Sequence, residues 1–434
     1  MDHSASSPSK FWAVISVLVG GLLLAAGLLA TLGYLGLPLA GLGSDLLAAQ
    51  LGQMAAMFLG LVCGGLAVYH GLGALLPLRT SALRLPPAWF FWIAFAVVLG
   101  IGNLLLNLQV AQAYLFPLLF LLGAALPTLA VAAWTLRRLG WPLTTRQAAL
   151  ALVGGSTLSV FVAIVAEAVL PYLAYIFIGP LQFLAGAFQD LAASGGGNFI
   201  ERLLFSPLAI VFLLTTALAA PIPEEIAKNL PVLIFGRGRV QTERQAFAIG
   251  VASGAGFAIL ENMLYQGLYA QYNGWTWGGI TLLRGAGSVL HPLCAGLVAL
   301  GWYRMRERGA GAWLKALGLA VGIHTLWNGG FELFLYFTGL QYYGQTDAGV
   351  RLYGMATEAL LVAFLVALAL GLWWLLRRVA GGLAQDVVAD LTPEIVSTRA
   401  LAVWAFACAL VVVPVGAALG GAWPQIAAIV MGGR

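Results

Sequence analysis

Long apolar runs recur along almost the whole of this sequence, and they restrict its possible folds more than any other feature. A run of 18 or more residues with few charges is long enough to cross a bilayer as a helix. Such runs lie at roughly 11–32, 47–69, 88–108, 113–136, 147–178, 205–235, 245–270, 280–303, 313–338, 354–376 and 400–420. Hydrophobic residues make up 61% of the 434 residues and charged residues only 9%, which excludes an ordinary soluble domain. The sequence therefore predicts an all-α polytopic membrane protein with about 11 transmembrane helices.

The basic residues predict how these helices are oriented. Most of the 21 Lys and Arg residues fall in segments that share one side of the membrane if the N-terminus is cytoplasmic. The net charge of +5 is spread over short loops and forms no basic patch, so we expect a lipid bilayer and no nucleic acid as a partner. The 3 cysteines all lie in apolar runs and indicate no disulfide framework.

The sixth run contains an unusual group of charges. Glu224 and Glu225 are followed by Lys228 within an otherwise apolar segment, and charges at this depth are usually paired and functional. Pro221 and Pro223 predict that the helix breaks near Pro221 and restarts with Pro223 at its first position. Both carboxylates would then lie in a first helical turn, where free N–H groups favour negative charge. Lys228 is spaced to reach either carboxylate.

Further polar residues lie in the next three runs. The seventh contains Glu261 and the eighth His291, whereas the ninth contains His324 and Asn328 on one helix face. Counted at 1.5 Å per residue from the inner ends of the runs, these four residues and Glu224 fall within about 10 Å of depth. A shared depth favours one pocket.

Three other polar residues in the apolar runs are not expected to belong to the catalytic group. Arg284 is expected at the outer membrane interface, and Glu167 is expected in a solvated or interfacial position. Cys294 lies one turn after His291 and could act as a nucleophile or ligand, although a buried cysteine in a membrane helix is more often a packing residue. The small residues Gly250 and Gly254 predict that another helix approaches the seventh run closely.

Two carboxylates and two imidazoles can activate water in two ways. A buried carboxylate can act as general base while His and Asn donors hold the developing oxyanion. Alternatively, the Glu and His side chains can bind a divalent metal such as zinc, which lowers the pKa of a bound water. The residues for a metal would be Glu224, Glu261, His291 and His324. Both mechanisms predict hydrolysis.

Four motifs in order resemble the PrsW family of intramembrane proteases, which is related to the CAAX-processing prenyl endopeptidases of the CPBP/ABI superfamily. The motifs are E-E-x-x-K (Glu224, Glu225, Lys228), F-x-x-x-E (Phe257, Glu261), a His after an upstream Arg (Arg284, His291) and H-x-x-x-N (His324, Asn328). They cover roughly residues 205–335. The resemblance implies that Glu224 is the base and that His324 and Asn328 hold the oxyanion. It also implies that Glu261 replaces the second-motif His of the prenyl endopeptidases, with His291 as the substitute imidazole, and PrsW-like proteins are often described as metalloproteases.

The resemblance also implies a biological setting. The expected substrate is a membrane-anchored regulator such as an anti-sigma factor, cleaved in the inner membrane during a bacterial envelope stress response. The chain would then divide into an N-terminal bundle of about five helices (1–200), a PrsW-like catalytic core (201–340) and C-terminal helices (341–434).

Two other functions remain open from the sequence. The first is a non-catalytic membrane scaffold or substrate receptor on the same fold. The second is a transporter that uses the buried acids as a proton relay. Transporters commonly contain paired broken helices in two internal repeats. This sequence shows one clear break and no internal repeat, which argues against transport.

Overall fold

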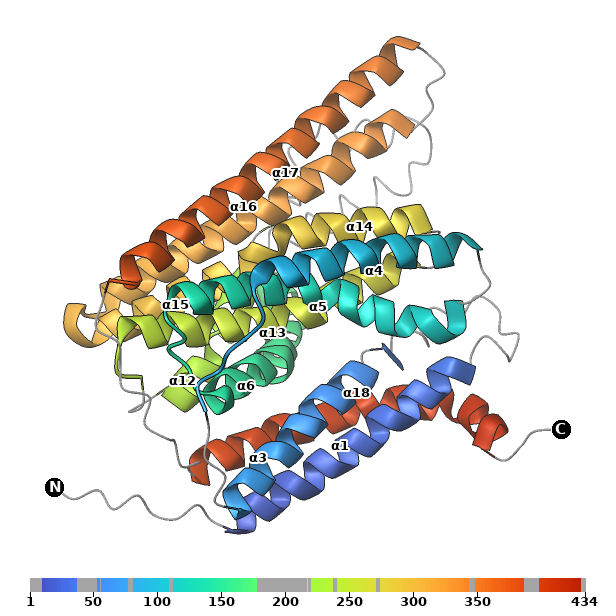
Figure 1. Cartoon of the computed structure of the whole chain (residues 1–434). Coiled ribbons are helices and arrows are strands. Elements are labelled where there is room, and N and C mark those ends of the chain that lie inside the picture. The colour runs from blue at the N-terminus through green and yellow to red at the C-terminus, as the bar shows by residue number, and fades with distance from the viewer. Residues whose placement is uncertain are drawn as a thin grey trace.

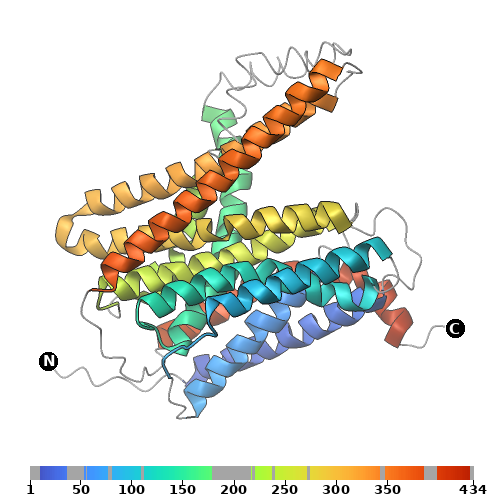
Figure 2. The ribbon, with the colours of Figure 1, turned by 45° about the horizontal axis from the view of Figure 1, so that its top comes forward.

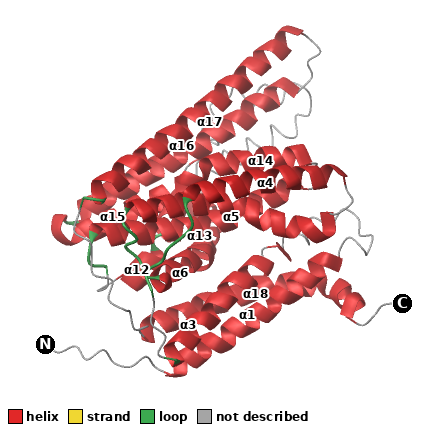
Figure 3. Ribbon diagram, in the orientation of Figure 1, coloured by secondary structure: helices red, strands yellow, loops and turns green. Residues whose placement is uncertain are grey.

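Helices form nearly all of the described part of the computed structural model of the protein (Figure 1; Figure 3). The structure describes residues 10–36, 53–54, 56–76, 81–108, 112–177, 217, 220–236, 240–270, 274–342, 348–385 and 398–430. No strand occurs among these residues, and an isolated bridge joins Ala82 to Thr144. Eight of the described helical segments are long and apolar enough to cross a membrane. The chain is therefore a multi-pass membrane protein, whereas the count of about 11 spans and the cytoplasmic N-terminus stay predictions.

The helices follow one another with short interruptions. In chain order they are α1 (Lys10–Gly36), η2 (Leu59–Gly64), α3 (Gly65–Leu75), α4 (Ala88–Leu108), α5 (Gln112–Arg138), α6 (Thr145–Gly154), η3 (Gly155–Ser159), α7 (Val160–Phe177), α11 (Pro221–Ala227), α12 (Leu230–Gly236), α13 (Glu243–Ala270), α14 (Gly274–Ala286), η4 (Gly287–Val289), α15 (Leu290–Arg308), α16 (Ala310–Tyr342), α17 (Ala348–Leu383) and α18 (Thr398–Val430). The first part of the predicted sixth span, 205–216, lies outside the described residues.

Three layers are visible in Figure 1. Helices α1, α3 and α18 form one layer, in which the first and last described helices pack side by side, and Ser16 Oγ of α1 donates to the carbonyl of Leu401 in α18 at 3.3 Å. Helices α4, α5, α13, α14 and α15 form the middle layer. The long pair α16 and α17 forms the third layer and diverges from the rest at one end, as Figure 2 also shows.

Helix α13 is the centre of the bundle. In the membrane-spanning part of α13, 89% of the residues are buried, whereas in that of α17 only 17% are buried. Large apolar side chains of α17 face outward, as expected for contact with lipid. Glycines let α13 approach its neighbours closely. Gly254 lies against the backbone of His291 in α15, and Gly256 lies against the carbonyl of Leu152 in α6. The predicted close approach is thus confirmed, and it places α13 directly beside the helix that carries His291.

Candidate active site

The charged segment of the sixth run folds into two short helices. Helix α11 begins at Pro221, which occupies a first-turn position, and Glu224 lies in that first turn. The predicted restart at Pro223 is therefore wrong by two residues, because Pro221 itself suits a helix start. The helical pattern is next interrupted at Lys228 and Asn229, between α11 and α12.

Two side chains stabilise this interruption. The amide Nδ2 of Asn229 donates to the carbonyl of Glu225 at 3.0 Å. The hydroxyl of Ser253, on α13, donates to the carbonyl of Lys228 at 2.5 Å. Carbonyls that lose their helical partners inside a membrane protein need such replacements. The broken backbone is consequently held to α13, and the carboxylates of α11 are fixed at the centre of the bundle.

Lys228 is the shared cation of the two adjacent carboxylates. Its Nζ lies 2.8 Å from Glu224 Oε2 and 2.8 Å from Glu225 Oε1, and its side chain is fully buried. The ammonium also lies over the ring of Phe257 at 4.3 Å from the centroid, which is a favourable cation–π contact. The reach to both carboxylates that helical spacing predicted is confirmed.

Each of the two histidines has one ring nitrogen against a carboxylate. His324 Nδ1, from α16, lies 2.8 Å from Glu225 Oε1. His291 Nε2, at the start of α15, lies 2.7 Å from Glu261 Oε2 on α13. A carboxylate beside one ring nitrogen favours the tautomer that carries its proton there. The other nitrogen of each ring is then an available lone pair.

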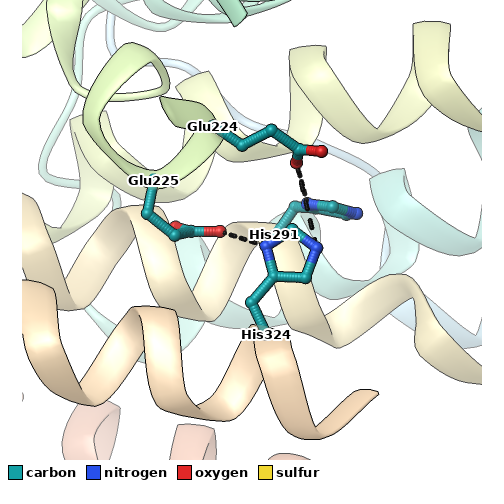
Figure 4. A group of neighbouring side chains, drawn as sticks. All are labelled: Glu224, Glu225, His291 and His324. Carbon is teal, nitrogen blue, oxygen red and sulfur yellow. Dashed lines mark hydrogen bonds and ion pairs between the residues drawn. The ribbon is translucent and has the colours of Figure 1, made fainter. Parts of the chain in front are cut away.

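Those two other nitrogens face the same oxygen. His324 Nε2 lies 3.8 Å from Glu224 Oε2, and His291 Nδ1 lies 4.0 Å from it. The two rings are perpendicular, with centroids 5.1 Å apart. Figure 4 shows the carboxylates of α11 facing the imidazoles of α15 and α16. Side chains from three helices, α11, α15 and α16, therefore meet at Glu224 Oε2.

This group also fits a metal ion. Glu224, Glu225, His291 and His324 each offer one ligand atom, and these atoms lie within 4.8 Å of one another. The buried His291 Nδ1 and Glu225 Oε2 have no hydrogen-bond partner within the described structure. Ligand atoms around a tetrahedral zinc are about 3.3–3.4 Å apart, given bonds of 2.0–2.1 Å. The separations of 3.8 and 4.0 Å at Glu224 Oε2 are close to that spacing.

Glu261 occupies a different position from the one predicted for a metal ligand. Its Oε1 lies 2.9 Å from Arg284 Nη2, and its Oε2 lies against His291. Glu225 is the second carboxylate near the two imidazoles, where the sequence suggested Glu261. Glu261 thus supports His291 from behind.

Arg284 lies inside the protein beside the cluster, a placement that its expected position at the outer interface did not indicate. Its side chain is 12% exposed and contacts Glu261 and Asn262. Counting residues along the helix located its Cα but ignored the reach of a long side chain. An arginine inside a membrane span is itself a signal of a functional partner, and that signal could have identified it.

Three remaining polar residues lie near the cluster. Asn328 is half-buried, one turn after His324, and forms no hydrogen bond with the cluster within the described structure. Glu167, on α7, is half-buried, and its expected solvated or interfacial position stays a prediction. The buried thiol of Cys294 points to the carbonyl of Ala320 at 3.6 Å, which suits a packing role between α15 and α16.

The charges of the site do not balance when both imidazoles are neutral. Three carboxylates (Glu224, Glu225 and Glu261) face two permanent cations (Lys228 and Arg284). An uncompensated charge in a buried site is costly. The site is therefore suited to take up a further positive charge, either as a proton or as a metal ion.

Comparison with models of protein families matches residues 144–368 to the PrsW family intramembrane metalloprotease. The matched region covers more than half of the chain and runs from α6 to α17, so it includes every residue of the cluster. No curated protein and no solved structure matches the chain.

Proposed function

Because this chain belongs to the PrsW family of intramembrane metalloproteases, we propose that its membrane-embedded peptidase site lies between Glu224 Oε2, His291 Nδ1 and His324 Nε2. One observation carries this proposal: each imidazole has one nitrogen held by a carboxylate, and the other nitrogen of each faces Glu224 Oε2 at 3.8 or 4.0 Å. A water molecule between these three atoms would meet one carboxylate oxygen and two nitrogen lone pairs.

The residues of the cluster take distinct roles in peptide hydrolysis. In the form without metal, Glu224 takes the proton of the attacking water as general base. Lys228 holds Glu224 and Glu225 in place through its contacts with both carboxylates. Glu225 and Glu261 fix the tautomers of His324 and His291, respectively. Asn328, one turn after His324, is the candidate amide donor to the developing oxyanion.

The same residues fit the metal that the family description implies. Glu224, His291 and His324 would hold a zinc ion, and two His with one Glu is a known ligand set of zinc peptidases. When bound, such an ion lowers the pKa of a water and polarises a carbonyl. In this form His324 is a ligand, so Asn328 remains as the oxyanion donor.

The substrate and setting also belong to the proposal. An intramembrane peptidase acts on membrane-embedded substrates. We propose a membrane-anchored regulator of the anti-sigma-factor type, cleaved in a bacterial inner membrane as part of a stress response. The support for this assignment is the family resemblance of the four motifs.

Glu224→Gln tests the base. The protein is purified, reconstituted in liposomes and assayed with a library of single-span reporter proteins. We expect cleavage to fall by a factor of about 10²–10⁴, the usual contribution of a general base. Thermal stability should stay near that of the wild type, because Lys228 keeps Glu225 as a partner and the amide is nearly isosteric.

The matched control is Glu307→Gln, which changes an exposed carboxylate at the end of α15. Persistent cleavage in Glu224→Gln would show that Glu224 is not the base.

Metal removal separates the two mechanisms. The wild-type protein is treated with a strong chelator, its metal content is measured, and zinc is then added back. We expect activity to decrease as the bound metal is removed and to return when zinc is added. Cleavage that survives complete removal would exclude the metal-dependent form and leave the carboxylate acting alone.

A further inference from the structure

Arg284 lies at the junction of three polar side chains behind the proposed site. Its Nη2 contacts Glu261 Oε1 at 2.9 Å, and its Nε donates to Asn262 Oδ1 at 2.7 Å. Its guanidinium also lies over the ring of Tyr265 at 4.6 Å from the centroid. All three partners are on α13, whereas Arg284 is in the last turn of α14. The guanidinium is thus fixed in plane by two acceptor oxygens and one aromatic face.

Asn262 is itself anchored. Its Nδ2 donates to the carbonyl of Ala124 in α5 at 3.4 Å, which leaves Oδ1 as the acceptor for Arg284. The contacts therefore form a continuous series from the backbone of α5 through Asn262, Arg284 and Glu261 to His291. Every side chain in this series is at least largely buried.

We infer that Arg284 is a positioning residue for hydrolysis. It binds one oxygen of Glu261 so that the other oxygen accepts a hydrogen bond from the Nε2–H of His291, and His291 Nδ1 is left directed at Glu224. This inference deepens the proposed function and rests on it.

The geometry explains why the carboxylate needs a second partner. A carboxylate attached to a helix can rotate about its side-chain torsions, and one contact to an imidazole does not fix its plane. Arg284 occupies the opposite oxygen and also supplies the positive charge that Glu261 needs in a buried position. Loss of that cation would leave Glu261 with His291 as its other close polar partner within the described structure. The plane of the Glu261 carboxylate and the orientation of the His291 ring would then no longer be fixed from both sides.

If Arg284 only linked α13 to α14, its replacement would affect activity no more than the loss of another ion pair that links two helices. The chain offers a matched control for that role in the ion pair between Arg304 of α15 and Glu243 of α13. There the guanidinium Nε and Nη2 contact the two carboxylate oxygens at 2.7 and 2.6 Å. This pair also links two helices, but it lies at the far end of α13 from Glu261.

The kinetic test compares Arg284→Gln with Arg304→Gln. We expect Arg284→Gln to lower kcat by about 10–100-fold, as for other partners that orient a ligating histidine, with little change in KM. Arg304→Gln should leave both parameters unchanged. Arg284→Lys should recover part of kcat, because a lysine keeps the charge but cannot serve Glu261 and Asn262 in one plane. If Arg284→Gln does not fold, Asn262→Ala carries the test, with a smaller loss of kcat expected.

A double variant tests the route through Glu261. If Arg284 acts through Glu261, adding Arg284→Gln to Glu261→Gln costs little further activity. Unchanged kcat in Arg284→Gln, an equal loss in Arg304→Gln, or full additivity of the double variant would each overturn the inference.

A spectroscopic readout does not depend on turnover. The chain contains 4 histidines, so ¹⁵N-histidine labelling gives few signals, and His291→Asn identifies the relevant one. We expect His291 to carry its proton on Nε2 in the wild type and to lose this single form in Arg284→Gln, while His324 keeps its Nδ1 proton. An unchanged His291 signal would refute positioning by Arg284. Retained cleavage in Glu224→Gln would refute the proposed function instead, so the two failures are distinguishable.

Discussion

Replacing Lys228 with methionine would leave two buried carboxylates without their shared cation. Methionine is close to lysine in length and fills the same space without charge. The lysine side chain is 0% exposed, as is that of Glu225, and that of Glu224 is 9% exposed, so water cannot replace the lost partner. Removing one member of a buried ion pair costs about 3–5 kcal/mol. Because this lysine serves two carboxylates, we expect at least that range.

The measurement is unfolding by SDS in mixed micelles. A loss of about 3–5 kcal/mol lowers the ratio of folded to unfolded protein by about two to four powers of ten, at about 1.4 kcal/mol for each. The control is Lys315→Met, which changes an exposed lysine on α16 and should alter stability by no more than about 0.5 kcal/mol. Adding Glu225→Gln to Lys228→Met should restore part of the loss, because it removes one uncompensated charge. Unfolding of Lys228→Met at the same SDS fraction as the wild type would refute the view that Lys228 holds two ionised carboxylates.

Two further substitutions test the packing around His291. Gly254→Ala would bring a methyl group onto the backbone of His291, so we expect a loss of about 1–3 kcal/mol in stability and lower cleavage, whereas Gly322→Ala, with open space beside it, should have neither effect. Equal effects of the two alanines would contradict the close approach of α13 and α15. Cys294→Ala should keep cleavage near the wild-type rate because the thiol contacts a carbonyl and not the cluster, and an inactive Cys294→Ala protein that folds normally would contradict that role.

Local spacing was enough to predict part of the site. The reach of Lys228 to both carboxylates follows from helical periodicity within a single short helix. Depth along the membrane also placed Glu224, His291 and His324 at one level, and the structure brings these three together. Depth has no information on which way a side chain points around its helix, however. It therefore could not show that Glu225 pairs with His324 and that Glu261 pairs with His291.

The contacts of Arg284 could not be predicted from its depth either. Its position in the sequence suggested the outer rim, but α14 packs against α13 and the guanidinium reaches Glu261. Spacing within one run does not describe how two helices pack.

The sequence alone determined that this chain is a helical membrane protein with a group of acids, imidazoles and a lysine at one depth, because hydrophobic length and helical periodicity are local properties. The tertiary structure decided which carboxylate holds which histidine, that both free ring nitrogens face Glu224, and that α1 packs against α18. Those relations depend on the rotation and close approach of helices that are far apart in the chain. Glycine contacts such as Gly254 against His291 set them, and they arise only when the whole bundle is assembled.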